Sequence, residues 1–496
     1  MKNITKLAFL ALLLISTNTI LAQNTQENDS ILSVELNEVV VSTPFKESVK
    51  NNVLRVSKLN LNNLNYIKRL NFSNAIQEVP GLSIISTGPG ISKPVIRGLS
   101  SNRVTVFNQY MRVENQQWGD EHGMEISGFG IESVEVIKGP MSVLYGSDAI
   151  GGVLYVNPDS YYNGDGSEIE LGTIYNSNYQ GLTTNLGIKG SSNKLSYLVQ
   201  ASLIDNKNFN TPDGEVENTY FKNSDLKFGL GYTSDNFISD LRVNINDSEI
   251  GIPHGEEDHD DHDDHDDHDD HDDDDHDDDD HDDDHDDDDH DDHEEHEEEK
   301  SYQDLTNTMI SWKNRILFDN KSEIEFTLGF SSNKRKEFGH HEEEGHDDHD
   351  DDDHDDDDHD DDDHDDHDEH GEGPALNMEL ETTTFDFKYI FPKSEKLELI
   401  IGANMLSQTN TNLAHEELIP NAEKNDLGVF ALSHIHTSKW DILLGLRIDN
   451  RKIETSDFDQ NYNSFTSSVG FKRDFAENKF FIISFHCTQS FTSLLG

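Results

Sequence analysis

The chain has 496 residues, with 37 Lys and Arg against 102 Asp and Glu, a formal net charge of −65. Nothing in that balance would neutralise nucleic-acid phosphates, and a single cysteine, Cys487, excludes a disulfide framework. No apolar run of about 18 residues follows the N-terminal region, which excludes a helical membrane protein. Two segments hold most of the charge: 256–299 contains 33 acids and 11 His, and 340–372 contains 22 acids and 9 His. The rest of the chain is only mildly acidic.

The first 22 residues are typical of an export signal. Lys2 and Lys6 precede an apolar stretch over residues 7–15, and Ala22 offers a small residue for cleavage. The stretch is too short to span a membrane, so a retained anchor is the weaker interpretation. We therefore expect a signal peptide over residues 1–22 and a mature chain outside the cytoplasm.

Residues 51–160 are predicted to form a mixed α/β unit. A helix is expected over residues 72–79, with a Ser near its start and Pro80-Gly81 ending it. Short β-rich pieces separated by Gly and Pro follow, at residues 82–85, 95–97, 104–107, 134–137 and 152–156.

From about residue 165 the pattern changes to strand-length segments in which apolar and polar residues alternate. Leu444, Leu446 and Ile448 alternate with Gly445 and Arg447, for example. Alternation of period two gives each strand one polar and one apolar face. Together with the export signal it favours a barrel in the outer membrane, although a secreted β-sandwich has the same alternation.

Three stretches resemble the plug domain of TonB-dependent outer-membrane receptors. Residues Glu38, Val39, Val40, Val41 and Ser42 resemble the TonB box, the segment that binds TonB, and residues 94–98, Pro-Val-Ile-Arg-Gly, resemble a plug strand. Residues 131–152, which begin Ile-Glu-Ser-Val-Glu-Val-Ile-Lys-Gly-Pro, are similar to the signature that closes the plug, and this match is the most specific of the three.

The resemblance implies an α+β plug domain inside a transmembrane antiparallel β-barrel of 22 strands. It also implies a periplasmic N-terminus, long loops outside the cell, and energy supplied by TonB of the inner-membrane complex. The expected domains are a flexible segment over 23–50 with the TonB box, a plug over 51–160, and a partial barrel over 161–496. Residues 254–300 and 340–373 are expected to be disordered extracellular loops.

The barrel is expected to be incomplete. Once the two acidic segments are set aside, the residues after 165 accommodate only about a dozen strands of barrel length with their connections. The final residues also lack the aromatic-ended last strand of the family. We therefore expect a chain that is C-terminally incomplete, either as a fragment or through an interrupted reading frame.

The two acidic segments, called the His/Asp runs below, are predicted to bind metal. Neutral imidazole and carboxylate together suit Zn²⁺, and imidazole also suits Ni²⁺ and Cu²⁺. A solvated acidic spacer is the alternative, but a spacer would not need twenty histidines. The ligands proposed are His259, His262, His265, His268, His271, His346, His349 and His354, none of them individually essential.

A second candidate metal site lies in the plug, at Asp120, Glu121 and His122. In an extended segment Asp120 and His122 point the same way, and with the runs they resemble the zinc-uptake branch of the family. A packing loop is an equal alternative. His415 and Glu416 are a third candidate, for which an ordinary loop without a bound metal is the favoured interpretation. His434 and His436 share one strand face and are expected inside the barrel lumen rather than at a metal, and Cys487 is given no role.

The leading functional hypothesis is active uptake of a divalent metal, with zinc favoured as the transported ligand rather than a cofactor. The expected partners are TonB, outer-membrane lipid and metal ions, with no nucleic acid. Receptors for haem, a siderophore, cobalamin or another metal chelate remain open, as does a surface metal-binding protein without transport. An enzyme is not expected, because no nucleophile elbow, P-loop, zincin or dinucleotide motif occurs.

Overall fold

The structure is a computed structural model. It describes residues 55–61, 72–88, 90–115, 122–139, 143–212, 214–253, 301–339, 373–414, 417–476 and 479–492. All of these residues belong to one compact unit, Val39–Gly496. A search of the described residues for a helix long and apolar enough to cross a membrane finds none. The expected signal peptide lies outside the described residues and stays a prediction.

The N-terminal part of the described chain is a small plug built on a five-stranded sheet. Its strand order is β1-β6-β7-β4-β5, antiparallel except for the parallel pair β4 and β7. The strands are β1 (Arg55–Asn60), β4 (Val104–Asn108), β5 (Met111–Val113), β6 (Ile131–Lys138) and β7 (Gly152–Pro158). The helix α3 (Phe72–Ile76), the hairpin β2 (Leu82–Gly88) with β3 (Ile91–Ile96), and the 3-10 turn η1 (Ser101–Arg103) complete it.

Sequence patterns located the plug elements well and their ends less well. The helix begins at the expected residue but ends at Ile76, and a turn carries the chain to Pro80. After β3, Arg97 and Gly98 both have positive φ, 56° and 76°, and Ile96 and Leu99 exchange backbone hydrogen bonds. Two consecutive residues of positive φ make a tight turn in which glycine is favoured.

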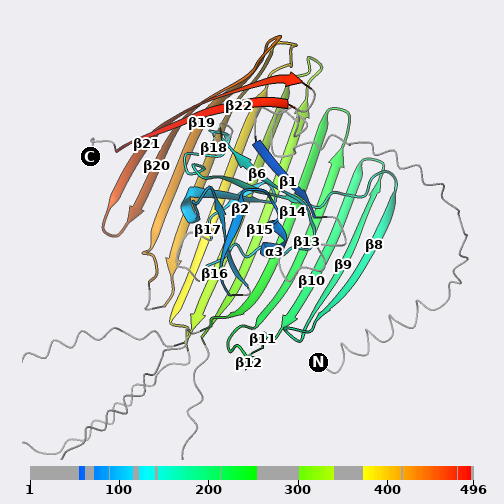
Figure 1. The fold of residues 1–496 in the computed structure, drawn as a ribbon, viewed down its shortest axis with the longest axis vertical. Helices are drawn as coiled ribbons and strands as arrows, with labels where there is room; N and C mark the ends of the chain where they lie inside the picture. Colours follow the sequence, from blue (N-terminus) through cyan, green and yellow to red (C-terminus); the bar gives the residue numbers. More distant parts are fainter. Residues whose placement is uncertain are drawn as a thin grey trace, which may run out of the picture. The chain divides into compact units, whose positions relative to one another are not determined.

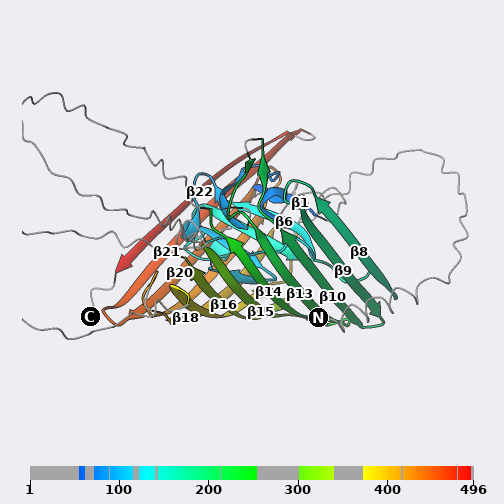
Figure 2. The same ribbon diagram turned by 90° about the horizontal axis from the view of Figure 1, so that it is seen from below.

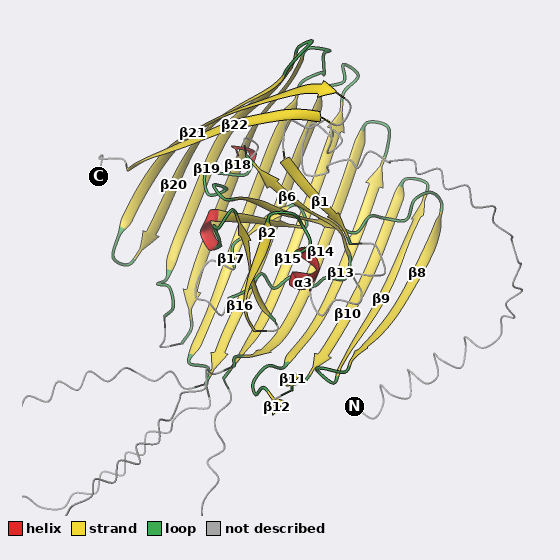
Figure 3. Ribbon diagram, viewed as in Figure 1, coloured by secondary structure: helices red, strands yellow, loops and turns green. Residues whose placement is uncertain are grey.

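The rest of the described chain forms one antiparallel sheet of thirteen strands (Figure 3). Its order is β22-β21-β20-β19-β18-β17-β16-β15-β14-β13-β10-β9-β8, so neighbours in sequence are neighbours in space. A small hairpin, β11 (Asn210–Thr211) with β12 (Gly214–Glu215), lies between β10 and β13. The strands are β8 (Gly166–Asn176), β9 (Gly181–Ser192), β10 (Leu195–Asn206), β13 (Phe221–Thr233), β14 (Phe237–Gly251), β15 (Tyr302–Leu317), β16 (Glu323–Phe338), β17 (Leu376–Ile390), β18 (Leu397–Asn412), β19 (Ala422–His436), β20 (Asp441–Thr455), β21 (Asp459–Ala476) and β22 (Lys479–Thr492).

The large sheet has an apolar outer face and a polar inner face. On β20, Leu446 and Ile448 are 54% and 57% exposed, whereas Arg447 between them is 4% exposed. A sandwich would bury its apolar face, so this arrangement is that of a barrel wall. The expected fold class, a plug with an antiparallel barrel-type sheet, is confirmed in this respect. Figures 1 and 2 show the plug elements β1 and β6 against one face of the sheet.

The two ends of the sheet differ in their connections. Register pairs Gly251 with Tyr302, Tyr302 with Phe338, and Glu337 with Leu376. The strand ends that flank both His/Asp runs therefore lie side by side at one end, called the loop end below. The other end, called the turn end, carries short connections at 391–396 and 437–440.

Candidate functional site between plug and sheet

His122 of the plug lies against the loop end of the sheet. Its side chain is 2% exposed, and its Nε2 is 2.9 Å from Oε1 of Glu337. Glu337 is the penultimate residue of β16, directly before the second His/Asp run, and it pairs in register with Gln303 at the start of β15. A plug histidine and a wall carboxylate therefore meet where both runs leave the sheet.

Close backbone packing fixes the loop that carries His122. A Cβ on Gly123 would lie 2.7 Å from the backbone N of Ser92, so only glycine fits there without a shift. The next residue, Met124, donates its N–H to the Ser92 carbonyl at 2.9 Å. This segment therefore packs against β3, and His122 is held at the edge of a fixed contact rather than at a loop tip.

A buried ion pair beneath His122 links the same elements. Arg335 of β16 donates from Nη2 to Oε1 of Glu125 at 2.5 Å, and the side chains are 0% and 2% exposed. Asn115 and Asn333 donate to Oε2 of Glu125 at 3.0 and 2.6 Å. Glu125 also has a φ of 51°, a left-handed conformation that costs about 1–2 kcal/mol for a residue other than glycine.

These groups favour cation chemistry at His122 and Glu337. An imidazole nitrogen and a carboxylate oxygen are ligands for Zn²⁺ and similar ions. Two ligands do not complete a metal site, and Nη1 of Arg335 lies 3.5 Å from Oε1 of Glu337 and competes for it. Asp120 and Glu121, the expected further ligands, lie outside the described residues.

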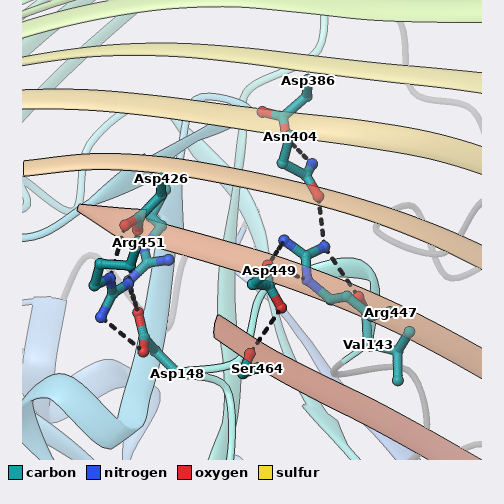
Figure 4. A network of polar contacts seen from close by, with 10 residues as sticks. Val143, Asp148, Asp386, Asn404, Asp426, Arg447, Asp449, Arg451 and Ser464 are labelled. Carbon is teal, nitrogen blue, oxygen red and sulfur yellow. Dashed lines mark hydrogen bonds and ion pairs between the residues drawn. The ribbon is translucent and has the colours of Figure 1, made fainter. Parts of the chain in front are cut away.

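A second set of ion pairs fastens the plug to strands β19 and β20. Asp148 of the plug accepts hydrogen bonds from Arg112 at 2.6 Å and from Arg451 of β20 at 2.6 and 3.2 Å. Arg451 also pairs with Asp426 of β19 at 2.6 Å (Figure 4). Nearby, Arg447 of β20 donates to the Val143 carbonyl at 3.2 Å. The closing segment of the plug is therefore held by two arginines of the wall.

Electrostatics stabilises the charged forms of the plug carboxylates in this set. Burial alone would raise the pKa of Glu114, but Arg112 and Lys424 beside it lower that pKa to about 2. Burial likewise opposes ionisation of Asp148, and Arg112 and Arg451 outweigh it, so the pKa of Asp148 falls well below its ordinary value.

A cavity of about 400 Å³ lies between the plug and the strands β8 to β14. Glu125 and Phe129 of the plug line it, opposite Gln200 and Asn223 of the wall. Its volume is in the range of sites for small organic ligands, and its wall is polar.

Most of the residues expected at the site lie outside the described part of the chain. The TonB box and Asp120, Glu121, His415 and Glu416 are among them, as are all eight histidines proposed in the runs, and their roles stay predictions. His122 is described and buried. Sequence analysis did not single out Glu337, Arg335 or Glu125. The position of Glu337 just before a run was a signal for it, whereas nothing in the sequence pairs Arg335 with Glu125.

His434 and His436 lie on the inner side of β19, as expected of residues facing the lumen. Their environment differs from the expectation in one respect, because Glu398 of β18 joins them. The ligand atoms of all three lie within 4.8 Å of one another.

Comparison with known proteins identifies the class. The family model for the TonB-dependent receptor plug domain matches residues 48–153. The vitamin B12 transporter BtuB of Photobacterium profundum is 26% identical over 229 residues, 44% of this chain and 38% of that protein. The FrpB iron transporter from Neisseria meningitidis (F3-3 variant) superposes with a TM-score of 0.63 at 13% identity, covering 87% of this chain and 63% of that one. The copper transporter OprC superposes with a TM-score of 0.60 at 12% identity, covering 88% of this chain and 62% of that one.

A plug domain joined to a barrel-type wall of antiparallel strands defines a TonB-dependent receptor. Residues 48–153 of this chain match the plug domain of that family, and the wall has the fold of its barrels. The chain spans less than two thirds of the length of the relatives it matches. These relatives are transporters by name, not enzymes, in keeping with the absence of enzyme motifs. At such low identity the solved structures show the fold alone.

Proposed function

We propose that this chain acts in the outer membrane as a TonB-dependent receptor for a divalent metal, with zinc as the first candidate. In this proposal the His/Asp runs collect the ion outside the cell. A site formed by His122, Glu337 and the neighbouring Asp120 and Glu121 then holds it. TonB pulls on residues 38–42 to rearrange the plug and release the ion inward.

The contact between His122 and Glu337 carries the proposal. It joins two metal-ligating side chains from plug and wall, 2.9 Å apart, at the end of the sheet where both runs begin. The pair therefore lies beside the strand ends from which both runs leave the sheet. A buried site of defined geometry also selects an ion better than a flexible polyanion does.

Uptake of a larger ligand is the second candidate. The likeness to a vitamin B12 transporter supports it. The cavity of about 400 Å³ is the size of a small organic ligand or chelate rather than of cobalamin. The two acidic runs weigh against an anionic chelate such as a siderophore, because like charges repel at the entrance. A neutral or cationic chelate would not meet that barrier.

The test compares two changes in cells that depend on the receptor for zinc. The runs are redundant in ligands, whereas Asp120 and His122 are unique in the plug. The double variant Asp120→Ala with His122→Ala should therefore reduce uptake of radiolabelled zinc at limiting concentration more than deletion of 256–299. His486→Ala serves as a control outside the site, and surface expression must be matched.

If deletion of 256–299 reduced zinc uptake more than the double variant did, the specific site would lie elsewhere, and His415 and Glu416 would be the next candidates. In that case residues 118–123 are a packing loop. Uptake of labelled cobalamin by the same cells, unaffected by zinc, would favour the second candidate.

A further inference from the structure

A cluster of metal-ligating side chains lies at the turn end of the sheet, away from the site above. Glu398 is the second residue of β18, His434 and His436 are near the end of β19, and Asp441 begins β20. Register places Glu398 opposite His434, and His436 opposite Asp441. Three neighbouring strands thus bring two imidazoles and two carboxylates to one place.

The distances within the cluster are close to those of a metal site. Nε2 of His436 is 3.1 Å from Oε1 of Glu398, and the rings of His434 and His436 are 4.0 Å apart between centroids, tilted by 50°. Ligand atoms around a tetrahedral zinc, each about 2.0–2.1 Å from the metal, are separated by roughly 3.3 Å. Only small side-chain shifts would place an ion among the three groups.

Asp441 orients the ring of His436. Its Oδ1 lies 2.8 Å from Nδ1 of His436. A carboxylate that accepts the Nδ1 proton leaves the lone pair on Nε2, the atom that faces Glu398. This carboxylate–histidine arrangement is the one that holds a ligating histidine in the right tautomer.

Burial gives the cluster one closed side and one open side. His434 and Glu398 are 2% and 7% exposed, whereas the side chain of His436 is 24% exposed. Next to them on the inner face, Ile400 and Leu432 belong to the same buried apolar cluster as Val143 of the plug. Three protein ligands beside an accessible position are typical of sites where a ligand exchanges, and structural zinc sites are closed instead.

A cation already approaches this cluster. Nζ of Lys393, in the short connection before β18, is 2.6 Å from Oε1 of Glu398, and the lysine side chain is 62% exposed. An ammonium on an exposed and flexible side chain occupies the carboxylate that a metal would need. A bound ion would displace Lys393 into solvent at little cost.

We propose that Glu398, His434 and His436 form a second divalent-metal site, oriented by Asp441 and open to solvent in its fourth position. Two imidazoles and one carboxylate suit Zn²⁺, with Cu²⁺ and Ni²⁺ as competitors. The site lies about one strand length from His122, on the order of 40 Å. We assign this site the role of an exit station, the last place where the transported metal is bound before it leaves the receptor. That role rests on the proposed function, whereas metal binding at the site does not.

The test uses the full chain with both runs replaced by Gly-Ser linkers and with His122→Ala and His415→Ala, which removes the other candidate histidine ligands. This background should still bind Zn²⁺, and Co²⁺ should give the intense visible absorption of a low-coordinate site. His434→Ala and His436→Ala should abolish both signals. His486→Ala, a histidine on β22 outside the cluster, should leave both unchanged.

Two further variants, which keep all three ligands, distinguish a metal site from a hydrogen-bonded cluster with a purely structural role. Asp441→Asn should weaken Zn²⁺ binding about 10- to 100-fold by releasing the ring of His436. Lys393→Met should tighten binding, because it removes the competing cation. A purely structural cluster predicts no change of zinc affinity in either variant, and that result would overturn the proposal even if the histidine variants fail to fold.

Uptake separates this proposal from the preceding one. Zinc uptake by a receptor that has the runs and His122 restored but retains His436→Ala tests the exit station alone. Suppose that the variant without runs and without His122 binds zinc, but the intact receptor takes up no zinc. The proposed function would then be wrong, and this metal site would still be supported. If instead the intact receptor takes up zinc in a way that depends on His122, and the variant without runs and without His122 binds no zinc, the proposed function is supported and this second metal site is excluded.

Discussion

Arg335 of β16 and Glu125 of the plug form an ion pair with almost no access to solvent, 2.5 Å between Nη2 and Oε1. Arg335→Met should leave the Glu125 carboxylate buried without a counter-charge. Loss of one partner of such a pair costs about 3–5 kcal/mol. Urea unfolding of the lipid-embedded chain measures the change, and the double variant with Glu125→Gln should recover much of it.

Lys334→Met provides a matched control on the same strand. Lys334 pairs with Glu379 at 3.3 Å, but its side chain is 57% exposed. An exposed pair contributes about 0–1 kcal/mol, so this variant should unfold almost like the parent. Equal destabilisation by Lys334→Met and Arg335→Met would contradict the role given to burial.

Acid should loosen the plug where it contacts β19 and β20. The folded pKa of Glu114, about 2, lies below its ordinary value of 4.5, and the pKa of Asp148 is lowered as well. Groups with lowered pKa stabilise the folded state above their ordinary pKa, and this contribution is lost as pH falls toward the folded value. The protection of the β5 amides, measured as the exchange rate relative to the intrinsic rate at each pH, should therefore fall between pH 4.5 and about 2. Glu114→Gln should flatten this dependence, and an unchanged profile would contradict it.

The His/Asp runs should bind several metal ions with an affinity that falls in acid. Histidine must be neutral to coordinate, and neighbouring carboxylates raise its pKa. Calorimetric titration of a 256–299 peptide with Zn²⁺ should show more ions and more heat at about pH 7.5 than at about pH 5.5. A peptide with Asn in place of every His is the control. Identical titrations at the two pH values would exclude histidine coordination.

Coupling to TonB should depend on the Val-rich segment. In this family the segment adds a strand to TonB, and proline removes the main-chain N–H that such pairing needs. Val40→Pro in the intact receptor should abolish zinc uptake and leave zinc binding at the surface unchanged. Val40→Thr, which keeps the N–H and the branched side chain, is the control. Normal growth of the Val40→Pro strain on limiting zinc would argue against transport.

Much of the fold followed from local pattern. Period-two alternation located the wall strands because one face meets lipid and the other the plug, as Arg447 between Leu446 and Ile448 illustrates. Strand ends were less accessible to this reasoning. Residues 406–412 and 422–426 are almost entirely polar and carry no alternation, yet β18 and β19 extend through them.

The contacts between plug and wall were beyond sequence reasoning, because they join residues far apart in the chain. His122 stood out through its own neighbours, but its partner Glu337 is 215 positions away. The same holds for Arg451 and Asp148, separated by 303 positions. A pattern within one segment carries no information about which segment lies opposite.

The pairing of Tyr302 with Phe338 has a consequence for metal capture. Their rings stack with centroids 4.6 Å apart and an interplanar angle of 8°, one at the base of each run. Four adjacent strand ends hold the bases of both runs within about 15 Å. In the proposed function both runs are anchored within this distance, so they act as neighbouring reservoirs and an ion released by one run can be recaptured by the other. Lengthening the wall between the two bases would separate these reservoirs while leaving every ligand in place.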